Sequence, residues 1–257
     1  MLFENSEQNF NIRLIVNLLY NMKRKSIIQT PSCEDCMLNS ISVFNKLTFD
    51  ELNMLNYEKV CQINKKGTII YNEGSRMSGC YCINSGIIKL YKTGYEGREH
   101  IIRFAKKSEI IGYRSLFSND FACHTAKVIE DAQVCFIPGD TMFKLLEGNS
   151  KFAMEMLKLA CIELGEANSF ITDIAQKTVR ERLAEVLLIL KDSFGLDEEN
   201  FLQITLTREE FGNIIGTATE SIIRLLSEFK DNKLIEVEGR RIKLLNIKAI
   251  QKIAYRK

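Results

Sequence analysis

The sequence lacks the features of several protein classes. Two prolines among 257 residues leave no Pro-rich linker, and a net charge of +2 means that any basic surface must be local. The longest apolar runs, such as Ala184–Leu190, are far too short to span a bilayer. No secretory leader opens the chain, and Met22 is an alternative start. We therefore expect a reduced, cytoplasmic protein with no membrane partner.

Catalytic signatures are also missing. The sequence contains no P-loop, no H-E-x-x-H, no G-x-G-x-x-G and no Ser, His and Asp in the order of a triad. The two histidines, His100 and His124, do not have the spacing of metal ligands. The eight cysteines are scattered and form no compact disulfide framework. These absences argue against an enzyme.

Three kinds of pattern follow one another along the chain. Helices are predicted at Phe10–Lys25 and at Leu47–Asn56, where Thr48 and Glu51 have the spacing of a capping box. From Val60 to Pro138, short Gly-punctuated segments rich in Ile, Val, Tyr and Thr predict a β sandwich or barrel. Within it, "GIIKLYKTGYEGREHIIRF" predicts a hairpin.

A long helical pattern follows the predicted β region. Six apolar residues fall roughly on one stripe: Phe152, Met156, Leu159, Ile162, Phe170 and Ile174. This stripe is longer than one small domain needs, and it suits a helix that packs on the barrel and on a second subunit. The alternative is a helix buried within its own chain. Another helix is predicted at Val179–Gly195, ending at its glycine.

The stretch "LTREEFGNIIGTATESIIRLLSEF", Leu206–Phe229, predicts two short helices joined at Gly216. Thr207 and Glu210 form a second capping-box pattern. The apolar residues expected to be buried are Phe211, Ile214 and Ile215 in the first helix, and Ile222, Leu225, Leu226 and Phe229 in the second. Leu234–Asn246 then predicts two short strands around Glu238 and Gly239, which form a hairpin wing.

With those residues buried, Thr219, Glu220, Ile223 and Arg224 face outward. In a helix-turn-helix motif, this end of the second helix enters the major groove, where Arg pairs with guanine and Glu accepts from cytosine. Glu220 is also placed to hold Arg224 at i,i+4. The alternative is an αα-hairpin with an exposed salt bridge. The residues expected to contact DNA phosphates are Thr207, Arg208, Thr217 and Ser221.

Basic residues are in excess at this end of the chain. From residue 203 onward, eleven Lys and Arg oppose seven Asp and Glu, a local charge of +4 against +2 for the whole chain. A local cationic excess of this kind favours contact with the phosphates of double-stranded DNA.

On these residues the chain resembles the Crp/Fnr family of bacterial transcription regulators, from about Ile41 to the C-terminus. The helix-turn-helix and wing resemble the family's, with the E-[ST]-x-x-R core at Glu220, Ser221 and Arg224. The resemblance implies an α+β fold: an N-terminal cyclic-nucleotide-binding-like β jelly roll, a long dimerisation helix and a C-terminal winged helix-turn-helix. The expected domains are an extension over 1–40, a sensory β-roll over 41–145, the helix over 146–176 and the DNA-binding domain over 177–257.

The family also implies partners and an effector. A homodimer would bind an inverted-repeat operator and act with RNA polymerase, as an activator or a repressor. The effector pocket of family members matches "GYRSLFSNDFACHTA", with Gly112, Tyr113, Arg114, Ser115 and Cys123 as candidate residues. Ala122 and Cys123 fall where cyclic-AMP-binding members have Arg and Ser. Since a buried phosphate needs a cation, cyclic AMP bound in the usual way is not expected. The alternative is a structural turn.

An iron–sulfur cluster is the second sensory hypothesis. Oxygen-sensing members of the family hold a cluster with N-terminal cysteines and one cysteine of the β-roll, to which Cys33, Cys36 and Cys135 correspond. Because such a cluster takes four thiolates, a ligand is missing, and Ser42 stands where the remaining N-terminal one would be. Asp35, Ser42 or another cysteine would have to serve. A thiol or other metal role, or no cofactor, are the alternatives.

Overall fold

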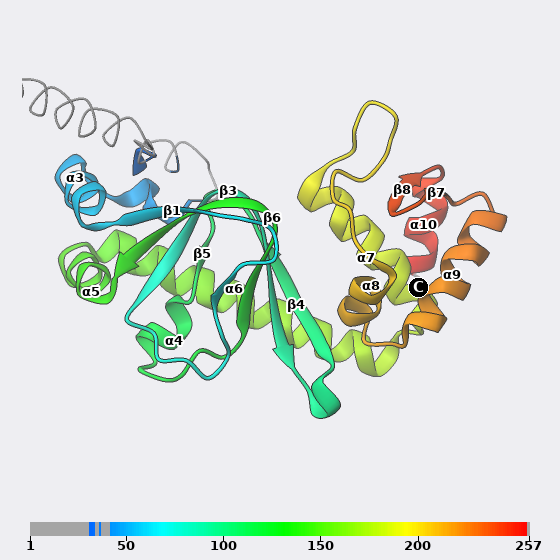
Figure 1. The fold of residues 1–257 in the computed structure, drawn as a ribbon, viewed down its shortest axis with the longest axis horizontal. Helices are drawn as coiled ribbons and strands as arrows, with labels where there is room; N and C mark the ends of the chain where they lie inside the picture. The colour runs from blue at the N-terminus through cyan, green and yellow to red at the C-terminus, as the bar shows by residue number, and fades with distance from the viewer. Residues whose placement is uncertain (1–30, 34–35, 37–41, 256–257) are drawn as a thin grey trace, which may run out of the picture.

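The computed structural model describes residues 31–33, 36 and 42–255, and the predicted helix Phe10–Lys25 and Asp35 lie outside these residues. Figure 1 shows a sheet of antiparallel strands, a long helix that runs on from it, and a cluster of helices with a small hairpin at the C-terminal end. No helix in the described ranges is long and apolar enough to cross a membrane. The fold is that of the predicted α+β class.

The sheet is built from strands in the order β1-β6-β3-β4, with β2 paired to β6 and β5 to β3. The predicted hairpin is present: β3 pairs with β4 from Ile88 opposite Ala105 to Thr93 opposite Glu99. The bounds are β1 Val60–Asn64, β2 Ile69–Tyr71, β3 Gly79–Thr93, β4 Glu99–Ala105, β5 Ile110–Ile111 and β6 Thr125–Pro138, with η2 Tyr95–Gly97 at the hairpin turn.

Helices flank the sheet on both sides in the sequence. The predicted capping box is present: Thr48 accepts from the Glu51 amide, and Glu51 accepts from the Thr48 amide. The helix it begins ends at Glu58, two residues beyond the prediction. The bounds are η1 Val43–Lys46, α3 Phe49–Glu58, α4 Tyr113–Phe117, α5 Gly139–Gly148 and α6 Ser150–Gln176.

The predicted apolar stripe on α6 is buried by the chain's own core only at its N-terminal end. Phe152 and Met156 are buried within the chain, and Leu159 packs against the same cluster. Ile162 and Ile174, by contrast, are 59% and 46% exposed. A second set of apolar side chains on α6 is exposed on another side of the helix: Met154, Leu157, Leu164 and Ile171.

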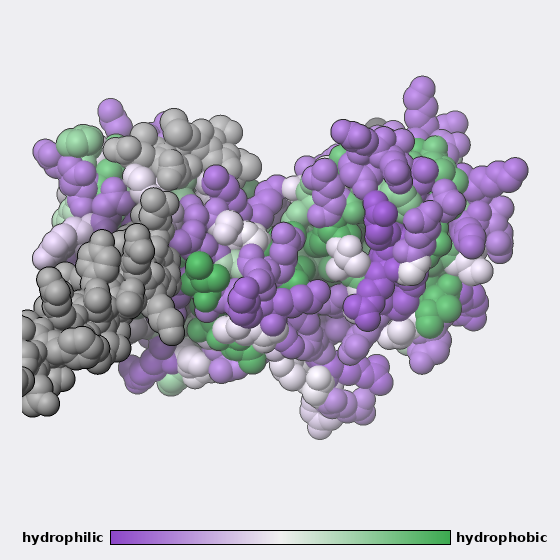
Figure 2. Space-filling model, turned by 45° about the horizontal axis from the view of Figure 1, so that its top comes forward, coloured by the Kyte–Doolittle hydropathy of each residue, from purple (hydrophilic) through white to green (hydrophobic). Residues whose placement is uncertain are grey.

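The C-terminal elements share one core. They are α7 Val179–Phe194, α8 Arg208–Ile215, α9 Thr219–Asp231, β7 Ile235–Glu238, β8 Arg241–Leu244 and α10 Ile247–Ala254. The predicted helix ending at Gly195 and the predicted wing hairpin are both present. Phe211, Phe229 and Ile222 are at most 1% exposed in this core. On the face drawn in Figure 2, the side chains over these elements are mostly hydrophilic.

The sheet contacts the C-terminal elements directly. The rings of Phe104 on β4 and Phe194 on α7 lie 6.0 Å apart edge to face. Lys106 donates to the carbonyl of Ser193, and Phe104 packs against the C-terminal core. The end of β4 therefore packs directly against the C-terminal end of α7.

Candidate functional site

The first part of the candidate site is the α8–α9 pair. Thr207 caps α8 and forms the predicted capping box with Glu210. Gly216 ends the helix with φ of 73° and ψ of 51°, the left-handed conformation that glycine adopts without a steric penalty. Gly212 is a second requirement, because a Cβ there would lie 2.9 Å from the Thr217 carbonyl oxygen. The sequence analysis identified Gly216 but not Gly212. The position of Gly212, one helical turn before Gly216, is the sequence feature that could have indicated it.

The outward residues of α9 lie as predicted on its solvent side. Glu220, Ile223 and Arg224 are exposed, while Ile222, Leu226 and Phe229 are buried and Leu225 is partly buried. Thr217, Thr219 and Ser221 are half-buried around the start of the helix. The predicted Glu220–Arg224 salt bridge is wrong: the two described side chains form no ion pair. Both charged groups are exposed and solvated, and the loss of this solvation offsets the electrostatic free energy that an ion pair would contribute.

Arg208 lies beside the wing. Its Nη2 donates to the carbonyl oxygen of Gly239, 3.0 Å away, in the turn between β7 and β8. Its Nη1 has no hydrogen-bond partner among the residues described. Arg208 therefore connects the wing to the start of α8, and its Nη1 is buried there.

Two arginines of α7 connect the motif to the rest of the chain, and sequence reasoning missed both. Arg180 pairs with Glu228 of α9 at 2.7 Å. Arg182 donates to the carbonyls of Lys177 at 2.8 Å and of Ile174 at 3.3 Å, near the end of α6, and through Nε to that of Ile215 at 3.0 Å, at the end of α8. One guanidinium therefore contacts both the end of α6 and the end of α8.

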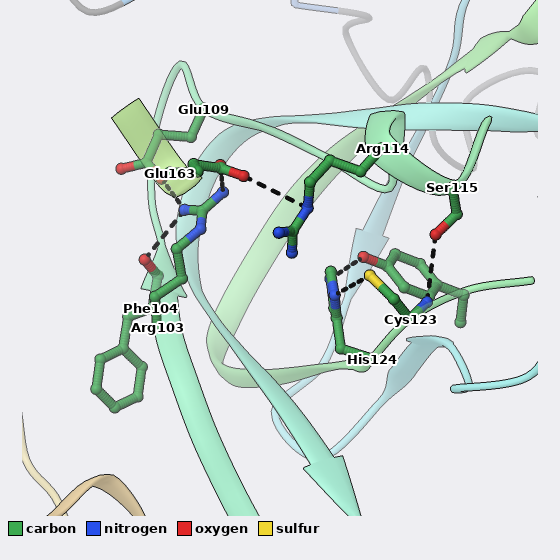
Figure 3. Close-up of polar contacts among 9 residues, drawn as sticks. Arg103, Phe104, Glu109, Arg114, Ser115, Cys123, His124 and Glu163 are labelled. Atoms are coloured by element: carbon green, nitrogen blue, oxygen red, sulfur yellow. Dashed lines mark hydrogen bonds and ion pairs between the residues drawn. The ribbon is translucent and has the colours of Figure 1, made fainter. Parts of the chain in front are cut away.

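The second part of the candidate site is the predicted effector stretch, drawn in Figure 3. Gly112, with φ of 80°, starts α4, and Tyr113 is buried behind it. The hydroxyl of Ser115 accepts from the Cys123 amide at 3.2 Å, which joins α4 to the start of β6. The structure thus brings the five candidate residues together at one end of the sheet.

An ion network connects this end of the sheet to α6 (Figure 3). Glu163 of α6 pairs with Arg103 of β4 at 3.0 Å and with Arg114 of α4 at 3.5 Å. Arg103 also pairs with Glu109 at 2.5 Å. Burial raises the pKa of the Glu109 carboxyl, against the lowering effect of Arg103. Sequence reasoning named Arg114 but not Arg103 or Glu163, which are distant in sequence.

His124 lies next to this network and is 4% exposed. Its Nε2 shares a hydrogen bond with the Tyr71 hydroxyl at 2.7 Å, and its Nδ1 lies 3.2 Å from Sγ of Cys123. Burial, helped by the charges of Arg114 and Arg103, lowers the pKa of His124 to about 4. The imidazole is therefore neutral in the folded protein at pH 7.

Acid is expected to destabilise the protein through His124. The pKa of His124 is lower in the folded than in the unfolded chain, so stability is full above pH 6.5 and is lost as the pH falls towards about 4. A shift of this size corresponds to about 3 kcal/mol. We expect urea unfolding at pH 7 and pH 4.5 to show a smaller loss for His124→Gln than for the wild type. Equal losses would contradict this assignment.

The predicted cluster ligands are only partly brought together. Cys33 and Cys36 are buried in one core, but Cys135 forms a disulfide with Cys61 across β1 and β6, so its sulfur is not available as a thiolate in this state. The hydroxyl of Ser42 caps η1 by accepting from the Phe44 amide at 3.3 Å. The predicted set of Cys33, Cys36 and Cys135 is therefore not assembled.

Comparison with known proteins gives matches over both halves of the chain. The cyclic nucleotide-binding domain matches residues 63–149, and the Crp-like helix-turn-helix domain matches residues 181–253. The fumarate and nitrate reduction regulatory protein of Yersinia pestis is 29% identical over 229 residues, which are 86% of this chain and 90% of that protein. The transcriptional activator protein anr of Pseudomonas aeruginosa is 26% identical over 218 residues, 83% of this chain and 88% of its own.

Solved structures show the same fold. FixK2 from Bradyrhizobium japonicum has a TM-score of 0.69 at 22% identity and covers 77% of this chain and 98% of its own. TTHA1359, a Crp/Fnr-family transcriptional regulator from Thermus thermophilus, has a TM-score of 0.64 at 22% identity, covering 77% and 98%.

Proposed function

Because the chain belongs to the Crp/Fnr family of transcription regulators, we propose that it acts as a homodimer that reads an inverted-repeat operator with α9 of each subunit, under the control of an effector. The observation that carries the proposal is the exposed start of α9, held between α8 and the wing by a buried core. The relatives whose names state a role are transcription regulators, and none of these names states an enzymatic reaction.

Base reading is assigned to Glu220 and Arg224, the exposed polar side chains on the first turns of α9. Arg presents two donors to guanine and Glu one acceptor to cytosine. Phosphate contacts are assigned to Thr207, Thr217, Thr219 and Ser221 around the helix starts, and to Arg208 beside the wing. These contacts would fix the register of α9 in the major groove.

The dimer contact is assigned to the exposed face of α6. Spacings of three and four residues connect Met154, Leu157, Cys161, Leu164, Asn168 and Ile171, the seam of a two-stranded coiled coil. The apolar members are between 51% and 65% exposed in the single chain. An Asn in such a seam sets the register of a parallel pair. A second copy on this face would place two α9 helices about a two-fold axis.

Effector control is assigned to the stretch around Gly112–Ser115 and Cys123. Arg103 and Arg114 both form ion pairs with Glu163 of α6. A ligand that changed these ion pairs would therefore act on α6. Arg182 then connects the end of α6 to α8. Cyclic AMP is not the expected ligand, because Ala122 and Cys123 supply no cation to its phosphate. Calorimetry that finds micromolar binding of cyclic AMP would contradict this.

Titration on DNA tests the proposed function. The wild type is expected to bind an inverted-repeat operator, selected from a random duplex pool, about 10³-fold or more tightly than random duplex at physiological salt. Half-sites are expected about one helical turn apart. Selection that returns only single half-sites, or no preferred sequence, would refute the homodimeric reading.

A further inference from the structure

Cys123 is a free thiol at the surface of the effector stretch. Of the six free cysteines in the described parts of the chain, only Cys123 and Cys161 are exposed. Cys161 lies in the proposed dimer seam on α6, where a second subunit would cover it. Cys123 is therefore the thiol that a small reagent in solution can reach in the dimer.

A histidine lies directly against this thiol. Nδ1 of His124 is 3.2 Å from Sγ of Cys123, within hydrogen-bond distance for sulfur. On the other side of the ring, Nε2 is 2.7 Å from the Tyr71 hydroxyl. When Nε2 carries the ring proton and donates it to Tyr71, Nδ1 is left to accept the thiol proton. Thiol, imidazole and hydroxyl then stand in the order of a nucleophile, its general base and the group that orients the base.

Both members of the thiol–imidazole pair are held in place. Burial lowers the pKa of His124 to about 4, so the ring is neutral at pH 7 and Nδ1 has a free lone pair. The ring also packs against that of Tyr71, with 5.6 Å between their centroids. The Cys123 amide donates to the Ser115 hydroxyl at 3.2 Å, which fixes the backbone of the thiol to α4.

Arg114 adds a positive charge beside the pair (Figure 3). Its side chain is 41% exposed, and its Nε lies 3.5 Å from Glu163 of α6. The guanidinium is close enough for its charge to act on both His124 and Tyr71. Reactive cysteines occur in electropositive, partly exposed surroundings of this kind, because a nearby cation stabilises the thiolate. The same cation would stabilise an oxygen that leaves with negative charge.

We propose that Cys123 is a peroxide-reactive thiol and that its oxidation to a sulfenic acid is the event that the effector region senses. Sγ attacks one oxygen of a hydroperoxide, ROOH, so that an S–O bond forms and the O–O bond breaks. Nδ1 of His124 takes the thiol proton and passes it to the leaving oxygen, which departs as ROH. Sulfur loses two electrons and the peroxide gains them, and the product is the sulfenic acid of Cys123.

The oxidised thiol would act on α6 through Arg114. A sulfenic acid, or its anion, places a new acceptor oxygen beside the guanidinium, where it competes with Glu163. The Arg114–Glu163 pair would weaken, while Arg103 keeps its own contact with Glu163 at 3.0 Å. Reduction by a thiol would restore the starting state. The reactive thiol is independent of the proposed function, whereas the sensing step rests on it.

The rate of oxidation tests the thiol without DNA. Reduced full-length protein is treated with hydrogen peroxide, and the sulfenic acid is trapped with dimedone and quantified at each cysteine by mass spectrometry. We expect Cys123 to react about 10²-fold faster than an exposed cysteine that lacks a general base. The double variant Cys123→Ser/Ser227→Cys supplies that control, because Ser227 is exposed on α9.

Two neighbours of the thiol provide the second comparison. His124→Gln should lower the rate at Cys123 to that of the control, and Arg114→Gln, which changes an exposed side chain, should lower it severalfold. Circular dichroism confirms that each variant is folded. Equal rates at Cys123 of the wild type and at the cysteine of Ser227→Cys would overturn the site. So would an unchanged rate in Arg114→Gln together with an unchanged rate in His124→Gln.

Operator titration before and after oxidation tests the sensing step. The affinity of the wild type should change by about fivefold or more and return with dithiothreitol, whereas Cys123→Ser should not respond to peroxide. A fast-reacting Cys123 whose oxidation leaves operator affinity unchanged would overturn the sensing step. Protein that binds no operator but is oxidised rapidly at Cys123 would contradict the proposed function and the sensing step with it, while the reactive thiol would stand.

Discussion

Leu164→Glu on the exposed face of α6 is expected to convert the protein from dimer to monomer. Leu164 is 62% exposed in the single chain and lies in the middle of the proposed seam. In the dimer, two glutamates would be buried opposite each other without partners. An uncompensated buried charge costs roughly 3–5 kcal/mol. Light scattering at several protein concentrations measures the mass.

Ile189→Glu is the matched control. Ile189 is 52% exposed on α7, outside the seam, so the same substitution there should leave the dimer mass unchanged. Leu159→Glu distinguishes the two faces of α6. Leu159 packs against the core of its own chain. Its replacement should therefore lower the midpoint of unfolding, whereas Leu164→Glu should change the dimer mass alone. An unchanged dimer in Leu164→Glu would remove the seam from the proposal.

Local patterns predicted most of the elements. Thr48 with Glu51 and Thr207 with Glu210 marked helix starts, and the structure has a capping box at each. Gly216 marked the turn of the helix pair, and the Gly-rich segment around residue 94 marked the β3–β4 hairpin. Each of these signals operates within a few residues, where hydrogen bonding and backbone conformation are decided locally.

Contacts between distant segments were not predictable in the same way. Periodicity showed that α6 has apolar residues, but not that Phe152 would turn into its own core and Ile162 away from it. Neither spacing nor composition relates Cys82 to Cys36, or Glu163 to Arg103. These pairings depend on the register of strands and the crossing of helices, which one sequence does not determine. The sequence therefore predicted the part of the candidate site whose residues are close together in the chain, in α8 and α9.

The second large effect is expected at Arg224, which is proposed to contact a base. Arg224→Ala is expected to weaken binding to the selected operator by about 1–3 kcal/mol, which is roughly 5–150-fold, and to relax the preference for the contacted guanine. The free guanidinium supports this role, because Arg224 is exposed and is not held by Glu220 or another acid among the described residues. It can therefore turn towards a base edge without breaking an internal contact.

Arg208→Ala is the comparison that separates base from phosphate. Since Arg208 is a cation beside the wing and the start of α8, its loss should weaken all duplexes alike and reduce the salt slope by about one unit. The measurement is a titration of wild type and both variants on operator, on operator with the guanine replaced, and on random duplex, at two salt concentrations. If Arg224→Ala weakened random duplex as much as operator, Arg224 would contact phosphate, and α9 would have to read bases with Glu220 and Ile223 instead.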